Sequence, residues 1–185
     1  MWDTLFRLFT ELSSRKSVAK LAGIAAKSSL SRKLIPKFAS FYNIRLEEAE
    51  HGIEGYASLN DFFIRKLKPG SRPVDPDETS VVSPVDGMVA DAGHIAHDRT
   101  FTVKGQHYTV SELLNGSPHA ERYVCGEFAV LYLSPADYHR IHSPIDARII
   151  EFERIPGQVY PVNEPSMRLI KRVLSRNTRL VTYLE

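Results

Sequence analysis

The sequence predicts an α+β fold in which N-terminal amphipathic helices precede a β-rich domain. Three observations predict it. Apolar residues recur at helical spacing through the first 41 residues, short strand-like runs follow from residue 81 onward, and turn-forming residues separate those runs. A chain of 185 residues is long enough for one such domain with a helical appendage. We place the division at residue 60, between a helical region over 1–60 and a β-rich domain over 61–185.

The first predicted helix has one apolar face. Its members follow i, i+3, i+4, i+7, i+10 spacing: Trp2, Leu5, Phe6, Phe9 and Leu12. A second helical stretch over 18–41 mixes apolar residues with Lys and Arg, and Pro36 is expected to kink or divide it. Both stretches are therefore predicted to be amphipathic.

Basic charge is concentrated in the same region. Residues 1–45 contain nine Lys or Arg against Asp3 and Glu11, a net charge of +7, which leaves −5 for the other 140 residues. Apolar side chains beside cations are typical of a helix that lies on an anionic membrane surface. The alternative is that the apolar stripe packs on the body of the protein or on a partner subunit. Nucleic acid is not expected as a partner, because no zinc-finger spacing or RNA-recognition signature accompanies the charge.

The predicted elements of the second region begin with a short helix. Ser58 followed by Asp61 resembles a capping box that opens a helix through Ile64, which the turn around Gly70 ends. Strand-like runs follow at 81–89, 101–103, 107–110, 123–133, 148–155 and 179–184. A Lys104-Gly105 turn joins the second and third runs, and helices are expected from Ser111 and over 165–174.

Composition excludes several classes of protein. Hydrophobic residues at 43% and charged residues at 25% exclude disorder, a collagen-like chain and a polytopic membrane protein. No run of 18 or more apolar residues predicts a transmembrane helix. The single cysteine, Cys125, allows no intrachain disulfide and lies in an apolar run, so we expect it to be buried and unreactive in a reducing compartment.

Two histidines, His139 and His142, stand three residues apart in the segment SPADYHRIHSP over 134–144. Ser134 suits a helix N-cap and Pro135 the first helical position, and a helical turn there would project both imidazoles from one face. Pro135 and Pro144 restrict the backbone at both ends of the segment. The histidines could be hydrogen-bonded surface residues, metal ligands, or a general base and acid, and their spacing does not decide between these possibilities.

A metal site would need a third protein ligand. The candidates are Asp86, Asp137, His94, His97 and His107, and none of them forms a compact signature such as HExxH. Asp137 is also explained by the favourable interaction of an acidic residue with a helix N-terminus. Asp86, in the segment SPVDGMV, is either part of a simple Asp-Gly turn or a carboxylate that orients a histidine from another segment.

Four segments together resemble phosphatidylserine decarboxylases in order and spacing. They are NDFFIRKLKPGSRPVD (60–75), SPVDGMV (83–89), KGQHYTVSELL (104–114) and YLSPADYHRIHSP (132–144). The resemblance implies a self-processing proenzyme in which an aspartate, a histidine and a serine form a protease-like triad. The serine attacks the carbonyl of the preceding glycine, the ester eliminates, and the serine becomes an N-terminal pyruvoyl group. By motif position Asp86 matches the triad aspartate, His142 the triad base, and His139 a histidine that assists at the pyruvoyl centre.

The resemblance also implies the reaction and the partners. The covalent pyruvoyl group serves as an electron sink while phosphatidylserine loses carbon dioxide to become phosphatidylethanolamine. A lipid substrate gives the basic N-terminal helices a role at an anionic membrane surface, so we expect a peripheral protein on the cytoplasmic side of the cell membrane. The expected partners are phosphatidylserine and a small pyruvoyl-bearing subunit cut from the same proenzyme, with a homodimer possible. An archaeal-type serine lipid remains open as the substrate.

The processing motif of the family, a Gly-Ser pair well downstream of the histidines, does not occur before Glu185. Gly70-Ser71 and Gly116-Ser117 both precede the histidines in turn-rich contexts, and we interpret them as turns. We therefore expect this chain to be the large-subunit part of the proenzyme, inactive and poorly soluble alone. Two alternatives are a metal-dependent hydrolase that uses His139 and His142 as ligands, and a non-catalytic membrane-binding fragment.

Overall fold

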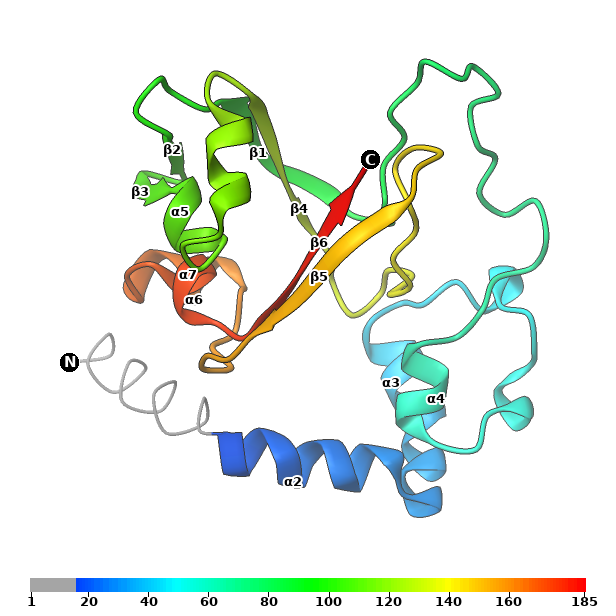
Figure 1. Cartoon of the computed structure of the whole chain (residues 1–185). Helices are drawn as coiled ribbons and strands as arrows, with labels where there is room; N and C mark the ends of the chain where they lie inside the picture. Colours follow the sequence, from blue (N-terminus) through cyan, green and yellow to red (C-terminus); the bar gives the residue numbers. More distant parts are fainter. Residues whose placement is uncertain (1–15) are drawn as a thin grey trace. The chain divides into compact units, whose positions relative to one another are not determined.

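A computed structural model describes residues 16–185 (Figure 1). Helices come first along the chain and antiparallel strand pairs follow, with short helices between them. The predicted α+β class is therefore confirmed. The amphipathic helix predicted over Trp2 to Leu12 lies outside the described residues. No helix within residues 16–185 is long and apolar enough to cross a membrane.

The second predicted helical stretch forms three pieces. They are the α-helix α2 (Lys16–Lys27), the 3-10 helix η1 (Ser29–Leu34) and the α-helix α3 (Ile35–Phe41). The expected division at Pro36 is confirmed, because helix α3 begins at Ile35 with Pro36 in its first turn, where a missing N–H leaves no helical hydrogen bond unmade. A second break, which was not predicted, occurs at Ser28, whose hydroxyl donates to the Ala25 carbonyl over 2.7 Å.

Helix α4 (Leu59–Phe63) begins as predicted. The Ser58 hydroxyl accepts from the Asp61 amide over 3.1 Å, and the Asp61 carboxylate accepts from the Ala57 amide over 3.0 Å. The helix ends at Ile64, earlier than the turn around Gly70. Together with α3 and the 3-10 helix η3 (Ile53–Gly55), helix α4 builds a small core. The 3-10 helix η2 (Leu46–Glu48) lies between α3 and η3 along the chain. The buried members of this core are Ile35, Ala39, Ile44, Tyr56 and Phe62.

Strands form antiparallel pairs within residues 16–185. The strands are β1 (Met88–His94), β2 (Thr100–Val103), β3 (Gln106–Thr109), β4 (Glu127–Tyr132), β5 (Ile149–Ile155) and β6 (Arg179–Leu184). They pair as β1 with β4, β2 with β3, and β5 with β6. The strand predicted over 81–89 is wrong for 81–87, since β1 begins at Met88. In that segment the Val82 amide bonds to Pro144 and the Pro84 carbonyl to the His142 amide, both across to a distant loop.

The β2–β3 hairpin turns as its sequence predicts. Lys104 and Gly105 both have positive φ (46° and 76°), the conformation of a two-residue hairpin turn. Helix α5 (Val110–Leu113) follows, and a capping box between Thr109 and Glu112 caps its N-terminus. Together with the 3-10 helix η4 (Pro118–Tyr123) these elements build a second core. Its buried members are Ile95, Phe101, Val103, Tyr108, Val110 and Ala120.

The helix predicted over 165–174 is divided into α6 (Glu164–Leu169) and α7 (Val173–Arg176), because Arg172 adopts a left-handed conformation (φ 59°). Cys125 is exposed, with φ 55°, so the prediction that it is buried is wrong. Cys125 lies in the turn before strand β4. The strand itself begins two residues later, within the same apolar run.

The described chain packs as two compact units. One contains Leu21–Met88 and Leu131–Arg148, and the other contains residues 16–20 together with Val89–Val130 and Ile149–Glu185. Each unit holds its own apolar core. The chain passes from one unit to the other inside β1 and inside β4. The boundary predicted at residue 60, between a helical region and a β-rich domain, stays a prediction.

Candidate active site

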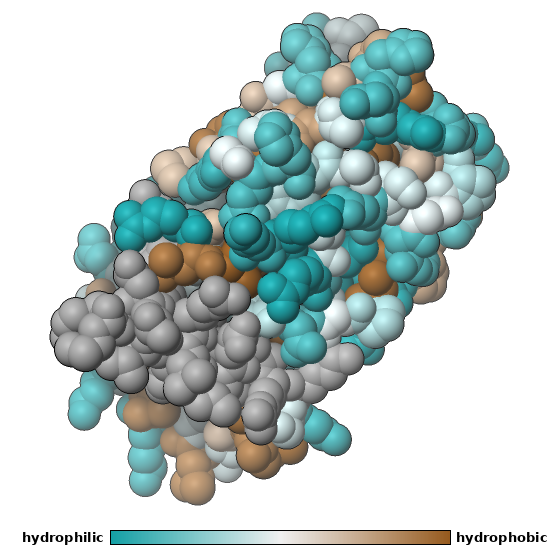
Figure 2. Space-filling view, turned by 90° about the vertical axis from the view of Figure 1, so that its left-hand side faces the viewer, coloured by the Kyte–Doolittle hydropathy of each residue, from teal (hydrophilic) through white to brown (hydrophobic). Residues whose placement is uncertain are grey.

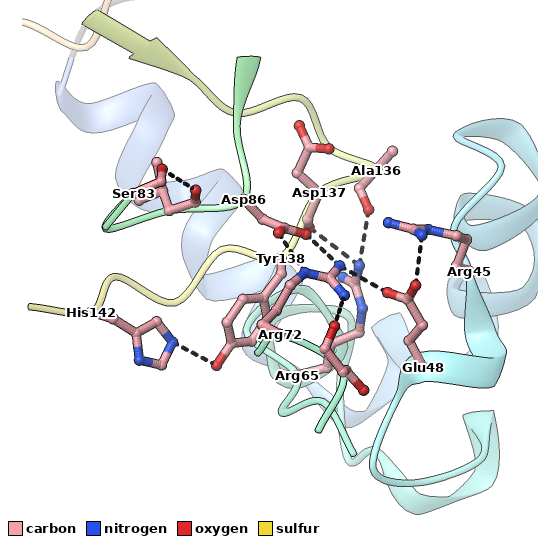
Figure 3. Close-up of polar contacts among 12 residues, drawn as sticks. Arg45, Glu48, Arg65, Arg72, Ser83, Asp86, Ala136, Asp137, Tyr138 and His142 are labelled. Atoms are coloured by element: carbon pink, nitrogen blue, oxygen red, sulfur yellow. Dashed lines mark hydrogen bonds and ion pairs between the residues drawn. The ribbon is translucent and has the colours of Figure 1, made fainter. Parts of the chain in front are cut away.

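The two segments with candidate catalytic residues lie side by side in one unit. The Val82 amide donates to the Pro144 carbonyl over 2.9 Å, and the His142 amide donates to the Pro84 carbonyl over 2.8 Å. A Cβ on Gly87 would lie 2.9 Å from the Tyr132 carbonyl oxygen. Glycine at position 87 therefore permits the close approach that places Asp86 beside the histidine segment, as Figure 3 shows.

The histidine segment is a turn followed by extended chain, so the predicted helical turn is wrong. The Asp137 amide donates to the Ser134 carbonyl over 3.0 Å, and the Asp137 carboxylate accepts from the Ser134 amide over 2.6 Å. These two bonds close a single turn. The amide of Tyr138, the next along the chain, bonds to the Asp86 carboxylate, and the amide of His142 bonds to Pro84, so neither amide supports a continued helix.

His139 is half-buried and held on two sides. Its Nε2 lies 2.8 Å from the Ser134 carbonyl oxygen, and its ring packs on Phe63 with 4.0 Å between centroids. A carbonyl oxygen only accepts hydrogen bonds, so Nε2 carries the proton. In the neutral imidazole the lone pair is then on Nδ1, which makes Nδ1 the nitrogen available for proton transfer.

His142 is more exposed and contacts a different partner. Its Nε2 lies 3.0 Å from the Tyr138 hydroxyl, and the two rings are nearly parallel at 5.5 Å. The two histidines thus differ in burial, neighbours and orientation. The structure gives them separate environments although they are only three residues apart.

Asp86 is bound by an arginine and not by a histidine. Arg72 Nε lies 2.5 Å from Asp86 Oδ1 and Arg72 Nη2 lies 2.6 Å from Oδ2, while the same Nη2 is 2.8 Å from Glu48 Oε2. The hydrogen bonds from Arg72 hold the pKa of Asp86 below its ordinary value, helped by the Tyr138 backbone amide. Tyr138 therefore contacts both candidate residues, Asp86 through its amide and His142 through its hydroxyl.

Arg72 and Tyr138 are site residues that the sequence analysis missed. Both stand inside the segments on which the family resemblance rests, Arg72 in PGSRP and Tyr138 in ADYHR. Neither residue could be singled out from the sequence, because an arginine in a turn and a tyrosine beside a histidine are common. Only the folded chain reveals that Arg72 binds Asp86 and that Tyr138 contacts both Asp86 and His142.

A groove opens beside Asp86. It has a volume of about 570 Å³ and is lined by Asp86, Gly87, Tyr132, Ser134 and Asp137, among others. Most of these groups are polar, and the groove is of the size that binds small molecules. Within residues 16–185 no three His, Cys, Asp or Glu side chains cluster in a way that could hold a metal ion. His94 and His107 have local partners instead, Glu127 and Thr102 respectively.

Comparison with known proteins decides the family. The family model described as phosphatidylserine decarboxylase matches residues 59–185. The chain belongs to the phosphatidylserine decarboxylase family. A phosphatidylserine decarboxylase proenzyme of Geobacillus sp. (strain WCH70) is 42% identical over 182 residues, which is 98% of this chain and 70% of that protein. Proenzymes of the same name from Bacillus cereus (strain ATCC 10987 / NRS 248) and Bacillus mycoides (strain KBAB4) are each 41% identical over the same shares.

Membership in this family makes the chain part of a carboxy-lyase, and it does not favour the metal-dependent hydrolase. The matched residues contain Asp86, His139 and His142. Their individual roles are not tested by the similarity and remain proposals.

Proposed function

We propose that this chain provides the large-subunit part of a phosphatidylserine decarboxylase proenzyme, which converts phosphatidylserine to phosphatidylethanolamine and carbon dioxide after cutting itself. The observation that carries this proposal is the family match over 59–185, which includes both segments that meet at the site. The chain spans 70% of the length of the Geobacillus relative, and the processing serine is proposed to correspond to a position in that protein outside the match.

Asp86 and His142 have the proposed role of cutting the chain. His142 would accept the proton of the serine hydroxyl as that oxygen attacks the preceding glycine carbonyl, and Asp86 would stabilise the protonated imidazole. Their segments are already joined by the bond from the His142 amide to Pro84. In this step Asp86 would exchange Arg72 for His142.

His139 has the proposed role in decarboxylation. Its ring is fixed by Phe63 and by the Ser134 carbonyl, and Nδ1 remains available to deliver or accept a proton. The groove beside Asp86 has room and polar lining for the pyruvoyl-bearing end of the small subunit. When present, the pyruvoyl group supplies a ketone that accepts electrons as carbon dioxide leaves.

The N-terminal region, 1–60, has the proposed role of binding the cytoplasmic side of the cell membrane through anionic lipids. In α2 the apolar side chains of Val18, Leu21 and Ile24 are 45%, 66% and 59% exposed at three-residue spacing. Lys20 and Lys27 lie beside them and are exposed as well. Figure 2 shows apolar and hydrophilic side chains together along its lower edge, the level at which α2 lies in Figure 1. Such a helix binds a bilayer surface without crossing it.

The experiment that tests the function is release of labelled carbon dioxide from carboxyl-labelled phosphatidylserine in mixed micelles. The protein is this chain extended after residue 185 by the remaining part of the Geobacillus relative. Release that persists in a chelator and stops when the ketone is reduced with borohydride supports a pyruvoyl-dependent decarboxylase. An extended protein that releases no label would contradict the proposed decarboxylase. A need for stoichiometric zinc would also contradict it and would favour the metal-dependent hydrolase.

A further inference from the structure

Arg65 ties the end of helix α4 to the histidine segment. It comes two residues after the helix, and its amide donates to the Phe62 carbonyl over 3.1 Å. Its Nη2 donates to the carbonyl oxygens of Ala136 and Asp137 over 2.9 and 3.2 Å, as Figure 3 shows. Both acceptors belong to the turn that precedes the histidines. One guanidinium group therefore holds two consecutive carbonyls of that turn.

The histidine segment binds the same helix end in return. Arg140 Nε donates to the Ile64 carbonyl over 2.8 Å. Beside it, the ring of His139 packs on Phe63 with 4.0 Å between centroids. Arg65 and Arg140 thus form a reciprocal pair, because the side chain of each binds the backbone of the segment to which the other belongs.

Stability alone does not explain why the buried residue is an arginine. The exposed fraction of Arg65 is 4%, and its Nε and Nη1 are buried without a hydrogen bond within residues 16–185. The neighbouring carboxylates of Glu48 and Asp86 both bond to Arg72. A buried charge with unpaired donors lowers stability unless other contacts offset it. The side-chain hydrogen bonds that Arg65 does make within residues 16–185 both go to the turn, which indicates a role there.

This turn determines the position of the His139 ring. The Ser134 carbonyl accepts from two donors, the Asp137 amide over 3.0 Å and Nε2 of His139 over 2.8 Å. Arg65 binds the carbonyl of Asp137 and so acts on the same turn. A displacement of the turn would move the acceptor of the Nε2 proton.

We propose that Arg65 and Arg140 are positioning residues for His139. They fix the turn over 134–137 against the end of helix α4. The fixed turn keeps the Nε2 proton of His139 on the Ser134 carbonyl, so that Nδ1 stays available for proton transfer. The kinetic part of this proposal rests on the role in decarboxylation proposed above for His139.

The second histidine is held by a different contact. The His142 amide donates to the Pro84 carbonyl over 2.8 Å, and neither arginine takes part in that bond. Loosening the arginine pair should therefore affect His139 and leave the self-cleavage assigned to His142 in place. A displaced acid or base slows the chemical step without weakening substrate binding.

The direct test is the NMR signal of the Nε2 proton of His139 in the 185-residue chain labelled with ¹⁵N-histidine. An imidazole proton gives a signal in water only while a hydrogen bond slows its exchange, and the signal is assigned by its loss in His139→Ala. Arg65→Met keeps a long side chain without donors, and the signal should disappear in this variant. Arg65→Lys, which keeps one donor group, should restore part of it. This readout needs neither self-cleavage nor decarboxylation, so it can fail while the proposed function holds.

Kinetics of the extended proenzyme provide the second readout. Arg65→Met should lower kcat for decarboxylation about 10- to 100-fold with KM unchanged, while the cleaved fraction equals that of the wild type. Arg140→Gln removes the reciprocal bond at a less buried position, and it decides the question if Arg65→Met fails to fold. It should also lose the Nε2 proton signal and lower kcat.

Arg32→Gln is the matched control, because Arg32 also donates to a backbone carbonyl of the same unit, that of Glu54 over 2.9 Å. It should change neither the signal nor kcat. An Nε2 proton signal that persists in every folded variant of Arg65 and Arg140 would overturn the proposal. Loss of self-cleavage in a folded variant would show that the pair supports both histidines, and it would overturn the assignment to His139.

Discussion

The carboxylate of Asp86 is paired with the guanidinium of Arg72 through two hydrogen bonds of 2.5 and 2.6 Å. Family resemblance assigns the same carboxylate to His142, yet His142 contacts the Tyr138 hydroxyl. The two segments are nevertheless joined through their backbones, and Tyr138 touches both residues. The Asp86–Arg72 pair therefore places the aspartate beside the histidine segment, and in the proposed triad Asp86 would exchange Arg72 for His142.

The first prediction concerns the pH dependence of this pair. Arg72 holds the folded-state pKa of Asp86 below its ordinary value of about 3.9, so the pair stabilises the fold above about pH 4. That contribution is lost as the pH falls through the lowered pKa of the folded state. Arg72→Gln should reduce the free energy of unfolding by about 1 kcal/mol at pH 7, a modest value because Arg72 is partly solvated.

Urea unfolding of wild type and Arg72→Gln from pH 7 to pH 3 measures this effect. The difference between the two should shrink steadily below pH 4. Arg32→Gln serves as the control, because within residues 16–185 the Arg32 side chain donates only to the carbonyl of Glu54. A difference that stays constant over this range would show that Arg72 acts through packing and not through the charge of Asp86.

The second prediction separates the two histidines. In the extended proenzyme His139→Ala should leave self-cleavage intact and reduce decarboxylation about 10²- to 10⁴-fold, the usual contribution of a positioned acid or base. The cleaved fraction is read from a denaturing gel and the activity from labelled carbon dioxide. Loss of cleavage in His139→Ala would contradict the division of roles.

The third prediction concerns Tyr138. Tyr138→Phe keeps the backbone amide that bonds to Asp86 and the ring beside His142, but removes the hydroxyl 3.0 Å from Nε2. Self-cleavage should slow about three- to tenfold, the effect of one lost hydrogen bond. The time course of cleavage after synthesis in a cell-free system provides the rate. Tyr42→Phe, in the same unit, is the control and should cleave at the wild-type rate. Equal cleavage rates for Tyr138→Phe and Tyr42→Phe would contradict a role of the Tyr138 hydroxyl in the site.

The fourth prediction concerns the glycine after Asp86. Gly87→Ala would place a Cβ 2.9 Å from the Tyr132 carbonyl, so it should destabilise the fold by about 1 to 3 kcal/mol and slow cleavage. Gly23→Ala in helix α2 is the matched control, because among the described residues no atom outside the helix's own backbone lies within 4 Å of the added Cβ. It should stabilise the fold by about 0.5 to 1 kcal/mol. Thermal unfolding of both variants decides the point, and an unchanged midpoint for Gly87→Ala would contradict the close approach.

The fifth prediction concerns membrane binding. Replacing Leu21 and Ile24 together by Ser should reduce co-sedimentation of the chain with phosphatidylserine-containing liposomes at least about tenfold, since two apolar side chains are lost from the interface. Val74→Ser with Val81→Ser changes two equally exposed residues elsewhere and should have little effect. Binding should weaken as salt is raised. Equal binding to neutral liposomes would contradict the role of Lys20 and Lys27.

Local patterns predicted much of the fold because they act over a few residues. The capping by Ser58, the Lys104-Gly105 turn and the strands around it form as expected, since each depends on neighbouring side chains and backbone. Predictions failed where distant backbone groups compete. The run from Val81 and the segment after Asp137 bond to each other, which prevents a strand in one and a helix in the other.

The candidate site was predictable in its location but not in its contacts. The resemblance placed Asp86, His139 and His142 in two segments, and those segments do meet. The contacts come partly from a third segment, in which Arg72 binds the Asp86 carboxylate and Arg65 binds the backbone of Ala136 and Asp137. No periodicity or spacing connects these residues, because only the fold brings them together.

The most direct test of the central claim is the intact mass of the extended proenzyme and of its Asp86→Asn and His142→Ala variants. The account predicts two chains for the wild type, the smaller one beginning with a pyruvoyl group, and a single uncut chain for each variant. Normal cleavage in His142→Ala or in Asp86→Asn would contradict it.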